Sequence, residues 1–164
     1  MEFIELSAPE LYTGYERSNI LITCIDTAAA RLTIAKNLKC KDIINKEPTE
    51  DMYYWLDLGN SQKTGQVVLG TLQRIPQPCV KDEETIATLP TVVKKFPELK
   101  KVKEKDQGPS CSLAEALGKQ DLFINGTIAR LGANILWKLF REAVITHHGA
   151  YLNLETMKTN PIII

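Results

Sequence analysis

The sequence has little that favours a charged partner or a membrane. Its 164 residues carry twenty Lys and Arg against twenty Asp and Glu, so the formal net charge is zero. A neutral chain gives no electrostatic reason to bind nucleic acid or an acidic membrane surface. No run approaches the roughly 18 apolar residues of a membrane-spanning helix, and the start carries Glu2 and Glu5 instead of the basic segment of a secretory signal. We therefore expect a cytoplasmic protein without a nucleic-acid or membrane partner.

Motifs for metal, redox and phosphate chemistry are also missing. The cysteines form no CxxC pair, which argues against a zinc site or a thioredoxin-like centre and favours free thiols; they are Cys24, Cys40, Cys79 and Cys111. The chain has no GxGxxG fingerprint and no Walker-type loop. Its length predicts a single domain over residues 1–164.

A strand followed by a helix is the first element that the sequence predicts. The run 20–25 is apolar throughout, which is typical of a strand covered on both faces in a parallel sheet. Residues 27–39 contain strong helix formers and place several apolar side chains on one face. Asp26 lies between these two elements. Because ligands of open parallel sheets bind where strands end and helices begin, Asp26 has the position of a ligand-contacting residue.

Two further strands and a long connection follow. Residues 52–58 and 66–73 are β-prone runs separated by a polar loop. The composition of 75–110, rich in proline and lysine, predicts a long exposed connection with some helix. Its lysines form either a solvated helical face or a patch for a docking partner.

The last third of the chain predicts a long helix over 121–144 with two apolar faces. One face contains Ile124, Ile128, Leu131, Ile135 and Leu139, and the other contains Ala129, Ala133, Leu136 and Phe140. Such a helix is buried between layers or in a subunit interface. Gly126 and Gly132 suggest a close approach of another element. A capping-box pattern predicts an earlier short helix from Ser112, and the end of the chain predicts a strand over 150–157 and a turn at 160–161.

Two side chains are candidates for phosphate or metal chemistry. Asp26 could hold a magnesium ion that bridges nucleotide phosphates, or it could cap the helix that follows it. Arg31, one helical turn further on, could reach a phosphate or face solvent.

The thiols and the histidines offer fewer candidates. Cys111 precedes the predicted helix start, where the helix dipole favours a thiolate nucleophile, although a partly buried structural cysteine is the alternative. Cys24 lies within an apolar strand and is expected to be inert. His147 and His148 point in opposite directions if the backbone is extended, so we expect surface residues that do not converge on a metal.

Several segments resemble the ThiF, MoeB and ubiquitin-activating-enzyme family, which adenylates the C-terminus of small ubiquitin-like proteins. Ile22-Thr23-Cys24-Ile25-Asp26-Thr27-Ala28-Ala29-Ala30-Arg31 resembles the family's strand, acid and helix; Thr64-Gly65-Gln66-Val67-Val68 resembles a Gly-Gln-Val strand, and residues 125–140 resemble a long late helix. The resemblance implies an α/β, three-layer, Rossmann-like fold with a mixed central sheet. It also implies ATP and magnesium as cofactors, with Asp26 on the metal and Arg31 in the nucleotide site.

The chain is most similar in its motifs to the ThiF-related member of the PRTRC cassettes of bacterial plasmids and mobile elements. The segments that carry this similarity are 54–60, 64–70, 109–117 and 120–125. The family's glycine-rich turn, ribose-binding acid and phosphate-binding Arg and Lys have no counterpart before Asn19, which implies an N-terminally truncated fold. Its two zinc-binding CxxC pairs are absent, so no zinc is implied. Cys111 falls in the loop where some relatives carry a thiol that accepts the activated partner.

Two functions are consistent with this resemblance. The chain could be part of an adenylyltransferase that needs a complementing N-terminal half and acts on a ubiquitin-like protein. Alternatively, it could be a non-catalytic scaffold or interaction component that keeps the fold and forms a homodimer. A nicotinamide-dependent oxidoreductase would share the architecture, but the dinucleotide fingerprint is missing. In either case the apolar strand 20–25 would lack some of its usual neighbours, and a second copy, the N-terminus or a separate protein would cover it.

Overall fold

The computed structural model describes residues 19–44, 52–77, 84–102 and 120–164. In these residues the chain is a mixed α/β fold built on a five-stranded sheet in the order β1-β2-β3-β4-β5. The strands are β1 (Ile20–Cys24), β2 (Tyr54–Asn60), β3 (Thr64–Thr71), β4 (His147–Asn153) and β5 (Lys158–Ile163). The helices are α1 (Ala28–Ile44), α2 (Val92–Lys95) and α4 (Ile124–Glu142), with a 3₁₀ turn, η1 (Pro97–Lys101). The prediction of an α/β fold with a mixed sheet is confirmed.

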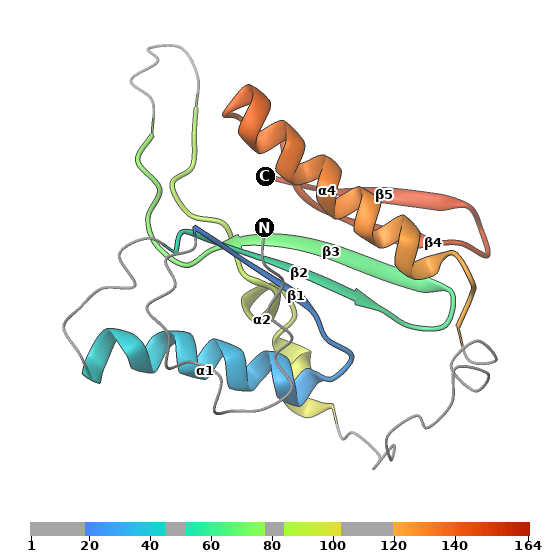
Figure 1. The fold of residues 1–164 in the computed structure, drawn as a ribbon, viewed down its shortest axis with the longest axis horizontal. Helices are drawn as coiled ribbons and strands as arrows, with labels where there is room; N and C mark the ends of the chain where they lie inside the picture. The colour runs from blue at the N-terminus through green and yellow to red at the C-terminus, as the bar shows by residue number, and fades with distance from the viewer. Residues whose placement is uncertain (1–18, 45–51, 78–83, 103–119) are drawn as a thin grey trace.

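The sheet is mixed because only one pair of strands is parallel. β1 pairs with β2 in parallel, and α1 is the crossover between them, whereas the pairs β2–β3, β3–β4 and β4–β5 are antiparallel. Short turns join β2 to β3 and β4 to β5, whereas the connection from β3 to β4 spans residues 72–146 and contains α2, η1 and α4. The carboxyl ends of β1 and β2 therefore meet at one edge of the sheet, next to the start of α1 (Figure 1).

Helices cover both faces of the sheet (Figure 1). The sheet has a hydrophobic core on each face. Successive side chains of β2 and β3 point to opposite faces, so they contribute alternately to the two cores. On one face Leu56 and Leu69 pack with Ile128 of α4. On the other, Trp55 and Val68 pack with α1, α2 and η1. The sheet is thus the middle layer of three.

The strands and α1 follow the sequence pattern closely, with shifted ends. α1 begins one residue after its predicted start and continues to Ile44. The two β-prone runs form a hairpin, but β2 and β3 extend into the polar loop, to Asn60 and from Thr64. Backbone pairing between the two strands extends past their apolar residues. Composition alone therefore places the end of β2 two residues too early and the start of β3 two residues too late.

Three C-terminal predictions are wrong. Residues 154–157 are a turn and not the end of a strand, and Asn160 and Pro161 lie within β5 and not in a turn. Pro161 is tolerated there because β5 is an edge strand of the described sheet, where a proline has no ladder bond to lose on its outer side. His148 is buried, contrary to the expectation of a surface residue, whereas His147 is exposed as expected.

The predicted late helix has one buried face and one exposed face. α4 turns Ile124, Ile128 and Ile135 to the sheet, while Trp137 and Phe140 are 65% and 69% exposed. The two glycines of this helix also differ. A Cβ on Gly132 would lie 3.1 Å from a methyl of Leu58, which confirms a close approach, but a Cβ on Gly126 would meet nothing within 4 Å among the described residues. The described residues therefore show no close approach at Gly126.

The connection over 75–110 contains the expected helix but is not exposed along its whole described length. Leu89 and Val92 are buried, and Val92 packs in the core beneath α1. Two hydrogen bonds hold Leu89 against Thr71, the last residue of β3. The Leu89 N–H donates to the Thr71 hydroxyl oxygen at 2.9 Å, and the Thr71 N–H donates to the Leu89 carbonyl at 3.1 Å. The predicted exposure of the connection is wrong at these residues. No helix in the described part of the chain is both long and apolar enough to cross a membrane.

Strand β1 is the edge of the described sheet, although its sequence is that of an interior strand. It pairs with β2 alone among the described strands, and Ile22, which lies on the side of the sheet that α4 covers elsewhere, is 43% exposed. Cys24, in the same strand, is also exposed and not buried. Among the described residues no strand pairs with the outer side of β1; that a second copy, the N-terminus or a separate protein covers it stays a prediction.

Candidate functional site

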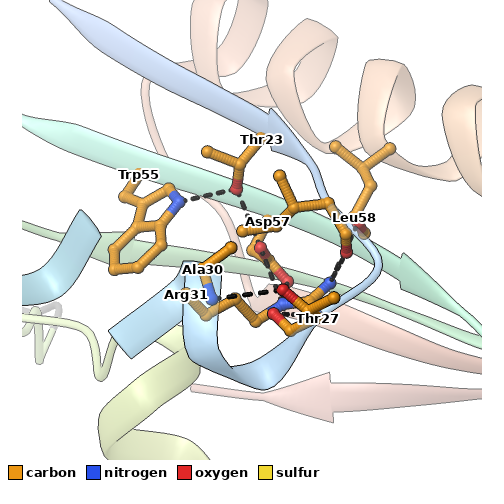
Figure 2. Close-up of polar contacts among 8 residues, drawn as sticks. Thr23, Thr27, Ala30, Arg31, Trp55, Asp57 and Leu58 are labelled. Carbon is orange, nitrogen blue, oxygen red and sulfur yellow. Dashed lines mark hydrogen bonds and ion pairs between the residues drawn. The ribbon is translucent and has the colours of Figure 1, made fainter. Parts of the chain in front are cut away.

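The polar residues at the carboxyl ends of β1 and β2 form the most developed polar cluster among the described residues. Figure 2 shows its centre, where Thr23 of β1, Trp55 and Asp57 of β2 and Arg31 of α1 converge. Asp57 has no exposed surface, and the side chain of Arg31 is only 6% exposed. Charged groups are this buried only when they are paired.

Arg31 and Asp57 form a bidentate ion pair. The Arg31 Nε donates to Oδ2 of Asp57 at 2.9 Å and to Oδ1 at 3.1 Å. The terminal nitrogens of Arg31 donate to main-chain carbonyls of Ile25, Thr27 and Leu58. The guanidinium thus ties the end of β1 and the first turn of α1 to the end of β2.

A second chain of hydrogen bonds reaches the same carboxylate from the other side. The Trp55 indole N–H donates to the Thr23 hydroxyl oxygen at 2.8 Å, and the Thr23 hydroxyl donates to Oδ1 of Asp57 at 2.8 Å. Burial raises the pKa of the Asp57 carboxyl above its ordinary value, and the Arg31 charge and the Thr23 hydrogen bond oppose this rise. No buried polar side-chain atom of the described residues is left without a partner.

The geometry corrects the alternatives left open for Arg31. Its side chain does not face solvent, because it is buried and bonded to Asp57. Asp57 was not among the site residues that the sequence predicted. An acid within the otherwise apolar run Tyr54-Trp55-Leu56-Asp57-Leu58 was the available signal, since an acid is rarely fully buried unless it is paired.

Asp26 lies beside this cluster but does not join it. It is exposed and makes no hydrogen bond or ion pair with the residues that the structure describes. The predicted capping role is filled instead by Thr27, whose hydroxyl accepts a hydrogen bond from the Ala30 N–H at 3.2 Å. The cap shifts because α1 begins at Ala28, directly after Thr27. Cys111 and the predicted helix start at Ser112 lie outside the described residues.

The described residues near Asp26 do not make a complete site for magnesium and ATP. Asp26 is a single carboxylate, and no group of three or more His, Cys, Asp or Glu side chains gathers in the described part of the chain. Arg31, the cation that the resemblance assigns to the nucleotide, has its charge balanced by Asp57. Without a glycine-rich loop in the sequence, few donors are left for a triphosphate.

A cleft opens next to the cluster, on the face of the sheet that carries α1. Its volume is about 400 Å³, and Arg31, Gly59, Gln66, Tyr151 and Asn160 are among the residues that line it. A Cβ at Gly59 would lie 2.5 Å from Nη2 of Arg31, so a larger residue there would force the guanidinium to shift. The predicted site residue Arg31 therefore lines the cleft and also forms the ion pair with Asp57.

Comparison with known proteins adds no relative. No protein-family model matches the chain, and no curated protein sequence matches it. The resemblance to the ThiF family thus rests on the motifs of the sequence.

Proposed function

We propose that the chain is a ThiF-like binding or scaffold module, which is not an adenylating enzyme on its own. One observation carries the proposal: the arginine expected to contact nucleotide phosphates is part of a buried structural ion pair. In this arrangement Arg31 fastens β1, α1 and β2 to one another, and withdrawing it for a ligand would leave Asp57 buried without a partner.

The Rossmann-like, ThiF-type variant of the fold belongs to the same proposal. The parallel pair β1–β2 with α1 as its crossover, the acid at the carboxyl end of β1 and the long α4 on the sheet support it. The same features occur in other mixed α/β folds, so the sequence motifs of Asp26 and of Thr64-Gly65-Gln66-Val67-Val68 carry the more specific part of the proposal.

We propose a homodimer as the assembled form. The exposed side of α4 presents Trp137 and Phe140, one turn apart, on a helix whose other side is already packed on the sheet. A second copy of the chain placed against this face would bury both aromatic rings. Edge strand β1 is a second surface that a complementing half or another protein would cover.

The second candidate function is adenylation in a complex, and Asp26 favours it. An exposed carboxylate that has no partner among the described residues, at the carboxyl end of a parallel strand, can bind magnesium together with substrate phosphates. In that case a complementing chain would supply the phosphate loop, and a ubiquitin-like protein would supply the C-terminus that becomes adenylated.

Calorimetry with magnesium and ATP separates the two candidates. For a scaffold module we expect no heat of binding above that of the variant Asp26→Asn, and a dimer by light scattering. Tight binding by the wild-type chain that Asp26→Asn abolishes would refute the scaffold proposal. Lys36→Gln, an exposed charge change further along α1, is the control for a general effect of charge.

A further inference from the structure

The cleft contains a row of polar side chains that the proposed function does not use. The strand registers align Gly59 with Gln66, Gln66 with Tyr151, and Tyr151 with Asn160. These residues therefore form one line across β2, β3, β4 and β5 on the face of the sheet that carries α1. Neighbouring strands are about 4.8 Å apart, so the three side chains beyond Gly59 span roughly 10 Å.

The polar groups of this row are unused by the residues that the structure describes. The Gln66 amide, the Tyr151 hydroxyl and the Asn160 amide make no side-chain hydrogen bond with the described residues, although each can both donate and accept. In contrast, the Ser61 and Thr64 hydroxyls at the rim lie 2.6 Å apart and bond to each other. The unused groups are thus concentrated in the row itself.

The electrostatics of the cleft favour a neutral ligand. Among the described residues no Asp, Glu, Lys or His side chain lines it, and Arg31 supplies their single formal charge. That charge is balanced at 2.9 Å by Asp57 and its nitrogens are bonded to carbonyl oxygens. An ammonium group would find no carboxylate and a phosphate would find no free cation, so a ligand gains most from hydrogen bonds.

An aromatic side chain adds an apolar surface in the middle of the row. Tyr151 is 37% exposed, and its ring packs edge-on against Phe96 with ring centroids 6.0 Å apart. The contact with Phe96 fixes the ring while part of its surface still faces the cleft. A flat apolar surface flanked by two amides suits a ring that bears hydroxyl groups, because each hydroxyl donates and accepts at one atom.

We propose that the row Gln66–Tyr151–Asn160 is a binding site for a neutral polyhydroxyl ring. Two sources share this chemistry: a saccharide and the ribose of a nucleoside. The side chains of the row hydrogen-bond the ring hydroxyls, and Tyr151 packs against the C–H face of the ring. Arg31 acts as a positioning residue that holds the end of β2 beside the row.

The test is an NMR titration of the full chain with four probes: maltose, adenosine, 2′,3′-dideoxyadenosine and inorganic phosphate. We expect saturable amide shifts around Gly65, Gln66 and Leu152 with maltose, or with adenosine but not with its dideoxy form; the responding probe identifies the source. The variant Tyr151→Phe, which keeps the contact with Phe96, and the exposed variant Asn160→Ala should each weaken binding several-fold. Asn134→Ala, an exposed amide on α4, should leave binding unchanged.

Three results would overturn the proposal. One is the absence of saturable shifts with both maltose and adenosine at millimolar concentration. Another is a response to phosphate, or an equal response to adenosine and its dideoxy form, because either would assign the site to an anion or to a base. The third is binding that Tyr151→Phe and Asn160→Ala leave unchanged in folded protein. Because the titration contains no magnesium or ATP, its failure would leave the scaffold proposal standing.

Discussion

The two faces of one sheet are stabilised in different ways. Beneath α4, the described core is apolar throughout, with Leu56, Leu58 and Leu69 against Ile124 and Ile128. Beneath α1 and α2, an apolar cluster lies beside a buried ion pair and a buried histidine. An apolar face tolerates imperfect geometry, whereas a buried charge requires its partner. The polar face therefore has fewer acceptable arrangements, and it is also the face that carries the cleft.

The largest expected effect comes from breaking the buried pair. Asp57→Ala leaves the Arg31 charge buried without a partner, and we expect a loss of about 3–5 kcal/mol in the free energy of unfolding, measured by urea denaturation. The double variant Arg31→Met with Asp57→Leu removes both charges and should be more stable than Asp57→Ala. A double variant less stable than Asp57→Ala would show that the pair itself, and not the isolated charge, determines the loss.

The apolar face should respond to lost volume instead of lost charge. Ile128 is 3% exposed, so Ile128→Ala should cost about 2–4 kcal/mol through lost burial and a cavity. At protein concentrations where the chain is monomeric, the exposed variant Trp137→Ala on the same helix should change its stability by less than about 0.5 kcal/mol, whereas in the proposed dimer the loss should be larger because the ring would be buried. Equal losses for the two variants would mean that Trp137 is covered in solution, as a dimer through α4 requires.

The two glycines of α4 sharpen the comparison within one helix. Gly126→Ala should stabilise the protein by about 0.5–1 kcal/mol, because alanine favours a helix and nothing among the described residues lies within 4 Å of the added Cβ. Gly132→Ala should gain less or lose stability, since its Cβ would lie 3.1 Å from Leu58. Thermal denaturation of both variants measures the difference, and a larger gain at Gly132 would contradict the packing described.

The smallest expected effect is the pH dependence due to His148. Burial lowers its pKa below the ordinary 6.5, and the nearby Lys95 acts in the same direction, while the hydrogen bond from Nδ1 to the Leu69 carbonyl opposes it. The unfolded chain then binds the proton more readily, so the contribution of His148 to stability is lost as pH falls from 6.5 through its folded value.

Denaturation at a series of pH values tests this prediction. His148→Gln should flatten the decline in stability between about pH 7 and pH 5, where a histidine of lowered pKa titrates. A decline that is as steep in His148→Gln as in the wild type would contradict the assignment.

Local patterns were sufficient for most elements and insufficient for the site. The apolar run 20–25, the helix formers after it and the spacing of isoleucines in α4 predicted strand, helix and helix, because these patterns reflect the backbone period. Arg31 and Asp57 are 26 positions apart, and no local pattern indicates that they meet. The row across Gln66, Tyr151 and Asn160 depends on three strand registers, which are tertiary properties.

The sequence by itself determined the neutral charge, the absence of a glycine-rich phosphate loop and of CxxC pairs, and the order of β1, α1, β2, β3, α4 and β4. Only the tertiary structure decided the role of Arg31, the burial of His148 and the exposure of one side of α4. The physical reason is that composition and period act along the chain, whereas a buried charge is stabilised by a partner brought from a distant part of it. For this protein, that partner is Asp57. Because Arg31 is paired with it, this arginine, which was expected to bind a ligand, instead holds β1, α1 and β2 together.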